Sequence, residues 1–142
     1  MNEHCLFCEI LAGEEPASFL YRDELCTAFM DIQPVNPGHL LVIPNRHGSS
    51  LAELDVETGA QLFRVAQRLA GALRQSGVRC EGVNLFLADG QAAGQDVFHV
   101  HLHVIPRYAG DGYGHRFSPS YYELPERPEL DRLAERIRLS LG

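Results

Sequence analysis

The spacing of apolar residues predicts one long helix among several short strands. Apolar side chains at every third or fourth position (Leu62, Val65, Leu69 and Leu73) predict a helix that ends at Ser76-Gly77. Short apolar or alternating segments predict strands at residues 19–21, 26–30, 39–44, 82–87 and 99–104. Because most of these strands follow one another without a helical crossover, we expect an α+β fold with an antiparallel sheet of about five strands.

Two further patterns concern the helices. Ser50 followed by Glu53 is a capping-box pattern and predicts the start of the long helix. The spacing from Leu130 to Leu141 predicts a short amphipathic helix that closes the chain. The chain contains no internal repeat and no long linker, so we expect a single domain over residues 1–142.

The composition narrows the class of protein. Asp and Glu number 19 against 12 basic residues, all of them Arg, and the formal net charge is −7. This balance argues against a protein that binds nucleic-acid backbones. The absence of Lys excludes phosphate-loop chemistry and a nucleotidyl-lysine intermediate. There is no signal-peptide pattern and no apolar stretch as long as a membrane span, so we expect a soluble, cytoplasmic protein. Four cysteines in a reducing compartment are expected to bind metal or to pack in the core.

Three histidines alternate with apolar residues between His99 and His103. On a strand, alternate residues share one face, so His99, His101 and His103 are expected to form a row opposite an apolar row that packs on the core. The outer two histidines of such a row lie about 13 Å apart, too far for one metal ion to bind all three. We therefore expect these imidazoles to have at least two different roles.

A Cys-x-x-Cys pair, Cys5 and Cys8, lies near the N-terminus. Such a pair fits a redox motif, a zinc site or two unpaired small residues on a loop, and no βαβ pattern surrounds it to favour the redox motif. His47 and His99 are the candidates to complete a Cys2His2 set, which would be a structural zinc site. The other two cysteines, Cys26 and Cys80, lie in apolar segments and are expected in the core.

With His99 as a zinc ligand, His101 and His103 are left for chemistry. A neutral imidazole is a competent nucleophile, and its attack on phosphorus would split one difficult displacement into two easier steps. The glycine-bearing loop at residues 89–95 is expected to offer backbone N–H groups to phosphate oxygens. These residues predict phosphoryl or nucleotidyl transfer. The rival interpretation, a catalytic zinc hydrolase that uses two of the three histidines, lacks a His-Glu-x-x-His motif and leaves the cysteine pair without a role.

Residues 88–106, ADGQAAGQDVFHVHLHVIP, resemble the signature of the histidine-triad (HIT) nucleotide-binding proteins. Residues 29–34 and 37–44 and the following His47 fall in the order and spacing of that family, so the resemblance covers roughly residues 4–107. The Cys5/Cys8 pair is similar to that of zinc-binding bacterial members related to the Hint branch, in which two histidines at the positions of His47 and His99 complete the zinc site.

The resemblance implies a HIT-like fold and a hydrolase or transferase that acts at the α-phosphate of a nucleoside 5′-phosphate derivative. His101 would be the nucleophile, with its ring oriented by the main-chain carbonyl of His99. His103 and His39 would contact the phosphate, and Gln95 would lie beside the leaving group. The implied nucleotide pocket contains a ribose-binding carboxylate and apolar walls: Asp31, Leu6, Phe7, Ile10, Phe29 and Ile32. The expected partners are a purine nucleotide or nucleoside phosphoramidate and a second copy of the chain, not nucleic acid or membrane.

Two positions depart from the family pattern. Ala88 stands where many relatives have Asn, and Asp96 stands where Ser or Thr is frequent. A carboxylate at position 96 would repel a phosphate leaving group but accept a hydrogen bond from an amine, which favours nucleoside phosphoramidates such as adenosine 5′-phosphoramidate as substrates. The alternatives are a dinucleoside polyphosphate hydrolase, a non-catalytic nucleotide-binding module and a zinc-stabilised interaction protein.

Overall fold

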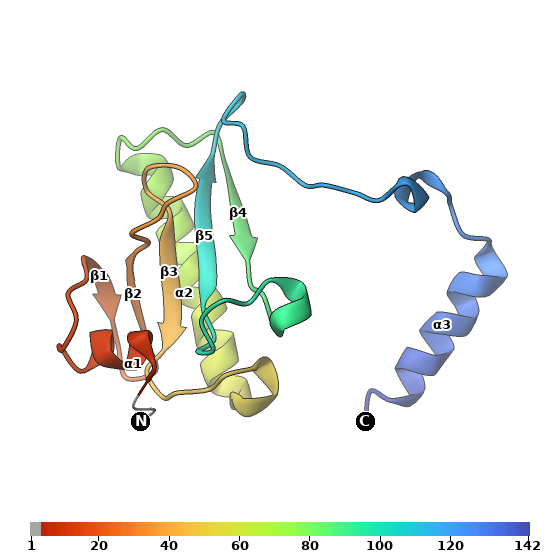
Figure 1. Cartoon of the computed structure of the whole chain (residues 1–142), viewed down its shortest axis with the longest axis horizontal. Helices are drawn as coiled ribbons and strands as arrows, with labels where there is room; N and C mark the ends of the chain where they lie inside the picture. Colours follow the sequence, from red (N-terminus) through yellow and green to blue (C-terminus); the bar gives the residue numbers. More distant parts are fainter. Residues whose placement is uncertain (1–3) are drawn as a thin grey trace. The chain divides into compact units, whose positions relative to one another are not determined.

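The computed structural model describes residues 4–142, and residues 4–111 are built around a five-stranded sheet (Figure 1). The strand order is β1-β2-β3-β5-β4, and every neighbouring pair is antiparallel. The strands are β1 (Phe19–Arg22), β2 (Cys26–Met30), β3 (Leu40–Pro44), β4 (Gly82–Phe86) and β5 (Leu102–Arg107). The predicted α+β class and antiparallel sheet are therefore confirmed.

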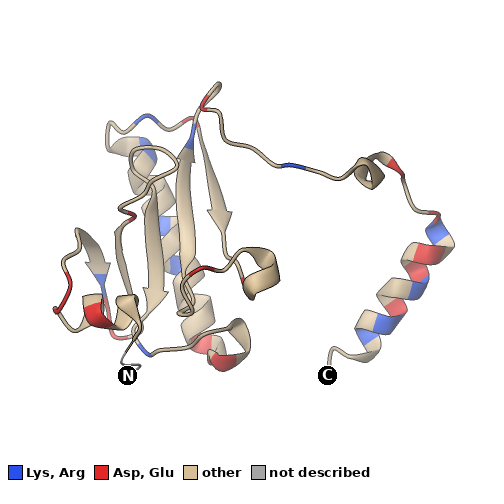
Figure 2. Ribbon diagram, in the orientation of Figure 1, with Lys and Arg blue, Asp and Glu red and all other residues tan. Residues whose placement is uncertain are grey.

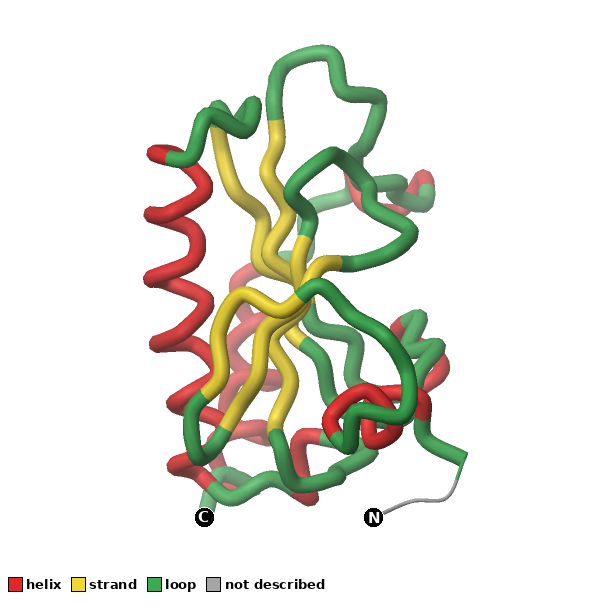
Figure 3. The backbone as a smooth tube through the Cα atoms, turned by 90° about the vertical axis from the view of Figure 1, so that its left-hand side faces the viewer, coloured by secondary structure: helices red, strands yellow, loops and turns green. Residues whose placement is uncertain are grey.

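One long helix, α2 (Val56–Gln75), covers one face of the sheet, and the short helix α1 (Leu6–Leu11) lies on the other (Figure 3). The first face holds the larger core, because apolar residues of α2 such as Leu62 and Val65 pack there against Val100, Leu102 and Val104. The second face holds a smaller core between α1 and the sheet, which includes Phe7, Phe29, Leu41 and Ile43. Cys26 is fully buried in the larger core, as predicted, whereas Cys80 is only partly buried at its margin.

The predicted capping box at Ser50 and Glu53 is wrong. Leu51–Glu53 forms a separate 3-10 turn without a side-chain cap, and the Glu53 carboxylate accepts a hydrogen bond from the Ser49 amide instead. The long helix begins at Val56, because the extended Asp55 caps it by accepting a hydrogen bond from the Thr58 amide at 2.8 Å.

The histidine strand also begins later than predicted. Only His103 lies within β5, while His99 and His101 precede it. Strand β3 pairs with β5 through Val42 and Leu102 but not beyond, and its last residue is Pro44, which has no N–H to continue the ladder. The three histidines still project away from the larger core, because Val100, Leu102 and Val104 point into it.

Residues 112–142 form a second compact unit, separate from residues 4–111. It contains a 3-10 turn, η3 (Pro119–Tyr122), and helix α3 (Arg127–Leu139), whose surface carries charges of both signs (Figure 2). Helix α3 begins three residues before the predicted Leu130, because Pro128 fits the first turn of a helix. The single domain over residues 1–142 stays a prediction. No helix in the described part of the chain is long and apolar enough to cross a membrane.

Candidate active site and metal centre

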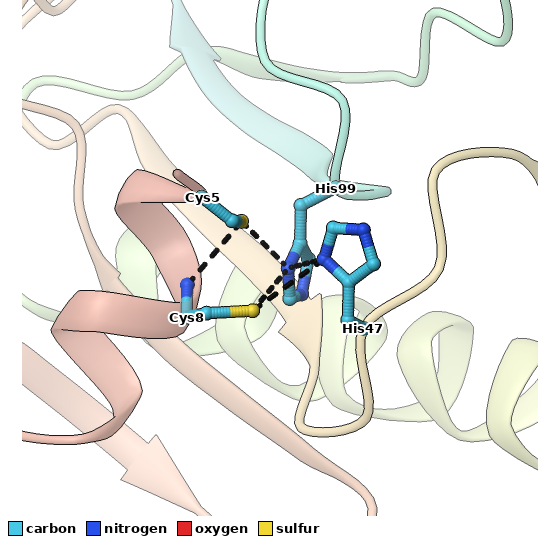
Figure 4. Close-up of side chains that lie close together, drawn as sticks. All are labelled: Cys5, Cys8, His47 and His99. Atoms are coloured by element: carbon cyan, nitrogen blue, oxygen red, sulfur yellow. Dashed lines mark hydrogen bonds between the residues drawn. The ribbon is translucent and has the colours of Figure 1, made fainter. Parts of the chain in front are cut away.

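Four residues from three segments of the chain meet near the end of β3 and the start of β5 (Figure 4). Cys5 precedes α1 and Cys8 lies in its first turn, while His47 follows β3 and His99 precedes β5. The Cys5 Sγ and His99 Nδ1 atoms are 3.3 Å apart, and the Nδ1 atoms of the two histidines are also 3.3 Å apart. Cys8 Sγ lies 3.4 Å from His47 Nδ1 and 3.6 Å from His99 Nδ1.

These separations match a tetrahedral zinc site. Zn–S bonds near 2.3 Å and Zn–N bonds near 2.0 Å place a sulfur and a nitrogen ligand about 3.5 Å apart and two nitrogens about 3.3 Å apart. His99 Nε2 lies 2.8 Å from the carbonyl oxygen of Pro44, so Nε2 carries the ring proton and the lone pair is on Nδ1, which faces the cluster. Burial raises the pKa of the Cys5 thiol, and a bound cation would supply the charge that a thiolate needs there. The residues therefore fit a closed structural zinc site.

The metal centre and the central histidine of the triad are joined through the main chain. His101 Nδ1 lies 2.8 Å from the carbonyl oxygen of His99, which can only accept, so Nδ1 carries the proton of the neutral ring. The lone pair is then on Nε2. The ring centroids of His101 and Phe7 are 5.2 Å apart, and His101 is almost completely buried. The orientation of the His101 ring is therefore fixed both by the hydrogen bond to His99 and by packing against Phe7.

A second set of contacts links His39, the residue that precedes β3, to His103 in β5. The Val35 amide donates to His39 Nδ1 at 2.9 Å, so the neutral ring of His39 carries its proton on Nε2. That atom lies 2.9 Å from His103 Nδ1 and 3.4 Å from Asp31 Oδ2. His39 therefore donates to His103, whose own proton is then on Nε2. Burial lowers the pKa of His39, and burial together with His101 and His39 lowers the pKa of His103 to about 4, so both rings are neutral at neutral pH.

This second set has the spacing of a metal site but not the proton arrangement of one. Ligand atoms of Asp31, His39 and His103 all lie within 4.8 Å of one another. A metal-binding nitrogen needs its lone pair, however, and the Val35 amide holds the His39 proton on the nitrogen that faces the other two residues. We interpret the three residues as a hydrogen-bond relay.

A cavity of about 390 Å³ opens beside the histidines. Its lining includes four polar side chains that lie close to one another, His101, His103, Asp31 and Asp96. Its lining also includes all five apolar residues of the nucleotide pocket that the family resemblance implies: Leu6, Phe7, Ile10, Phe29 and Ile32. The sequence did not identify Met30, Leu41 and Val97, which also line it, because their spacing does not distinguish a pocket wall from a core.

Asp96 lies at the exposed edge of this cavity. Its side chain is 84% exposed, and its Oδ1 atom is 3.7 Å from His101 Nε2. The same oxygen accepts a hydrogen bond from the Val97 amide at 2.9 Å, which holds the carboxylate near the triad. Ala88 is buried and offers no polar side chain.

The loop between β4 and His99 differs from its expected role. The amides of Gly90, Ala93, Gly94 and Gln95 all donate to groups within the loop, so the expectation that this loop presents free N–H groups to a phosphate is wrong for them. The buried Gln95 side chain accepts from the Gly90 amide and donates to the carbonyls of Ser49 and Val97, so it braces the loop. Its place beside a leaving group stays a prediction.

Comparisons with known proteins agree with this geometry. The family model described as HIT domain matches residues 12–110. A Bacillus subtilis protein named Protein hit is 43% identical over 113 residues, which are 79% of this chain and 77% of that protein. The Arabidopsis thaliana protein named adenylylsulfatase HINT3 is 34% identical over 78% of this chain and 56% of its own length. A crystal structure of a zinc-bound histidine triad family protein from Mycobacterium smegmatis is 42% identical and superposes over 96% of each chain with a TM-score of 0.75.

Proposed function

The chain belongs to the HIT domain family, and we propose that it is a hydrolase that cleaves nucleoside 5′-phosphate derivatives at the α-phosphate through a nucleotidyl-histidine on His101. One observation carries this proposal. The hydrogen bond from His101 Nδ1 to the His99 carbonyl leaves the Nε2 lone pair beside a cavity of nucleotide size. A nucleophile needs that lone pair and a fixed direction of attack.

In the first step, Nε2 of His101 would form a bond to phosphorus while the bond from phosphorus to the leaving group breaks. Water would then attack the same phosphorus, and the electron pair of the P–N bond would return to Nε2. The proton that the water loses would pass to solvent, which supplies the proton that the leaving group takes up. The Nδ1 proton stays hydrogen-bonded to the His99 carbonyl throughout, where it stabilises the positive charge that the ring acquires.

His103 is the proposed donor to the phosphate. The relay from Val35 through His39 leaves a proton on Nε2 of His103, on the edge of the ring opposite the His39 contact. His103 also lines the cavity next to His101, with ring centroids 4.9 Å apart. A neutral N–H donor at this position would bind a phosphate oxygen as charge develops on it.

The rest of the cavity suits a nucleoside. Phe7 and Phe29 offer aromatic rings on which a purine would pack, and Asp31, which lines the cavity 3.9 Å from His103 Nδ1, is a carboxylate that suits two ribose hydroxyls. We propose a purine nucleotide as the bound group, with Asp31 as the ribose ligand. The finer choice of a nucleoside phosphoramidate as substrate rests on Asp96, which would repel a phosphate leaving group.

The four-residue cluster would hold one zinc ion with a structural role. Zinc would fix α1, which carries Phe7 and Leu6, to the segment that carries His99. We also propose a homodimer, because β4 ends the sheet with a free edge and has two exposed apolar side chains, Leu85 and Phe86. A reducing cytoplasmic compartment would suit the four free cysteines.

The proposal is tested by single-turnover reaction of the zinc-loaded protein and of His101→Ala with adenosine 5′-phosphoramidate and with a diadenosine polyphosphate. We expect AMP release from the phosphoramidate by the unmodified protein, a trapped adenylylated peptide that contains residue 101, and neither with His101→Ala. Faster release from the diadenosine compound would favour the dinucleoside polyphosphate hydrolase. AMP binding without release from either substrate would favour a nucleotide-binding module, and no binding at all would contradict the proposed site.

A further inference from the structure

The charged side chains that line the cavity are all acidic. They are Glu15, Asp31 and Asp96, and none of the described lining residues is Arg. The chain contains no Lys, so no ammonium side chain can reach the site. A bound substrate therefore meets carboxylates and imidazole rings, and none of the described lining residues offers a guanidinium group, which suits one phosphate group but not a chain of several.

Asp96 has a specific place among these acids. Its Oδ1 atom lies 3.7 Å from His101 Nε2, and the Val97 amide holds it there. With a nucleoside packed on the apolar lining, as proposed above, a leaving group on the phosphate beside His101 would lie within reach of Asp96. The Nε2 lone pair is needed for the bond to phosphorus, so the Asp96 carboxylate is the acceptor beside the reacting atoms that can bind N–H groups of a substrate.

We propose that Asp96 determines which nucleoside 5′-phosphoramidates this site prefers, namely those whose leaving amine is cationic or uncharged rather than acidic. This inference rests on the proposed function and specifies its substrate class. A carboxylate at the departure edge attracts an ammonium or N–H group and repels a carboxylate, sulfate or phosphate on the leaving group.

The step balances with water as its other reactant. One proton from solvent joins the phosphoramidate nitrogen, where Asp96 stabilises the added positive charge. His101 Nε2 then bonds to phosphorus, the P–N bond breaks, and its electron pair leaves with the amine as RNH2. Hydrolysis of the nucleotidyl-histidine by water forms the P–O bond, restores the Nε2 lone pair and returns one proton to solvent.

The test uses three adenosine 5′-phosphoramidates of matched length, whose leaving amines are 1,2-diaminoethane, n-propylamine and β-alanine. We expect kcat/KM of the zinc-loaded protein to fall in that order, with about tenfold between the cationic and the acidic amine. In Asp96→Asn, which keeps the shape of the side chain, the ratio should fall to about threefold or less. Because Asp96 is exposed, the ratio in the unmodified protein should also shrink as salt is added.

Glu14→Gln is the matched control, because it removes the same charge from an exposed residue that does not line the cavity. It should keep the tenfold ratio, whereas Asp96→Asn should lose it, with zinc content and melting temperature equal in both variants. An unchanged ratio in Asp96→Asn, or equal rates for the three substrates in the unmodified protein, would overturn the role of Asp96 while leaving the hydrolase intact. Failure to release AMP from all three would instead contradict the proposed function.

Discussion

The ring of His101 hydrogen-bonds to the main-chain carbonyl of His99 at 2.8 Å, and the side chain of His99 belongs to the Cys2His2 cluster. The same residue thus contributes a ligand atom to the metal centre and an orienting group to the proposed nucleophile. Phe7 adds a second link, because it lies between the two cysteines in sequence and its ring contacts both His99 and His101. We infer that metal binding and the geometry of the triad depend on each other.

Cys8→Ser should therefore disturb more than the metal centre. Loss of one thiolate weakens zinc binding, so α1 is held less firmly against the sheet. The cavity wall formed by Phe7 then loses its fixed position. We expect the melting temperature to fall by about 10 °C or more and the affinity for AMP to fall with it. The measurements are zinc content, thermal unfolding and AMP titration by calorimetry.

Cys80→Ser is the control for this change. Cys80 lies outside the cluster, and its thiol donates to the carbonyl of Gly82, a contact that a hydroxyl can also make. Its zinc content and AMP affinity should match those of the unmodified protein. If Cys8→Ser bound AMP as tightly as Cys80→Ser did, the inferred link between the metal centre and the cavity would be wrong.

The relay makes a prediction about protons that NMR can test directly. Nitrogen-15 spectra of the ring atoms at neutral pH should show the proton on Nε2 in His39 and His103 and on Nδ1 in His101. His39→Gln should keep a donor to His103 and retain more activity than His39→Leu, for which we expect a loss of about ten- to a hundredfold in kcat/KM. A proton on Nδ1 of His39 would contradict the relay and would restore the Asp31 cluster as a candidate metal site.

The sequence predicted most of the fold because its strands carry short apolar segments and α2 has a regular apolar face. Its errors lie at boundaries that depend on neighbours. The start of β5 is set by the end of its pairing with β3 at Val42, and the start of α2 is set by competition between Ser50 and Asp55 as caps. Neither boundary can be read from the spacing of apolar residues.

The candidate metal ligands were predictable because cysteine and histidine are uncommon and their spacing limits the choices. The relay was not, since its first donor is the main-chain amide of Val35, and an amide has no sequence signal. Gln95 shows the same limit: its polar side chain suggests a ligand contact, whereas its three hydrogen bonds to main-chain groups emerge only when the loop is folded.

Acid should destabilise the fold through His103. Its folded-state pKa of about 4 lies below the ordinary value of 6.5. As pH falls below 6.5, His103 therefore binds a proton in the unfolded chain but stays unprotonated in the folded chain. This contribution to stability is complete above pH 6.5 and is lost as pH falls towards 4. We expect the free energy of unfolding to drop by about 1–2 kcal/mol more in the unmodified protein than in His103→Gln between pH 7 and pH 5.

Urea titrations of both proteins at each pH, with zinc in excess, measure this difference. The metal centre contains histidines that also bind protons in acid, but it is the same in both proteins and cancels in the comparison. Parallel curves for the two proteins would show that His103 does not carry the predicted shift.

Gly38 precedes His39, and we expect its replacement by Ala to lower the free energy of unfolding more than the same replacement at Gly77. Its φ of +100° lies in the region that favours glycine, and an added Cβ would lie 2.8 Å from Val78 Cγ1 and 3.3 Å from both Leu73 and Pro106. Gly77 has a similar φ of +87° but no atom within 4 Å of an added Cβ. Gly77→Ala should therefore show backbone strain alone and lower the free energy of unfolding by about 1 kcal/mol, whereas Gly38→Ala should add overpacking and lower it by about 2–4 kcal/mol.

Because the displaced backbone leads directly into His39, Gly38→Ala should also lower kcat/KM, and Gly77→Ala should not. Urea unfolding and steady-state kinetics of the pair decide the matter: equal stability losses would mean that the space beside Gly38 can yield, and that His39 is held by the Val35 amide rather than by the close packing of the turn.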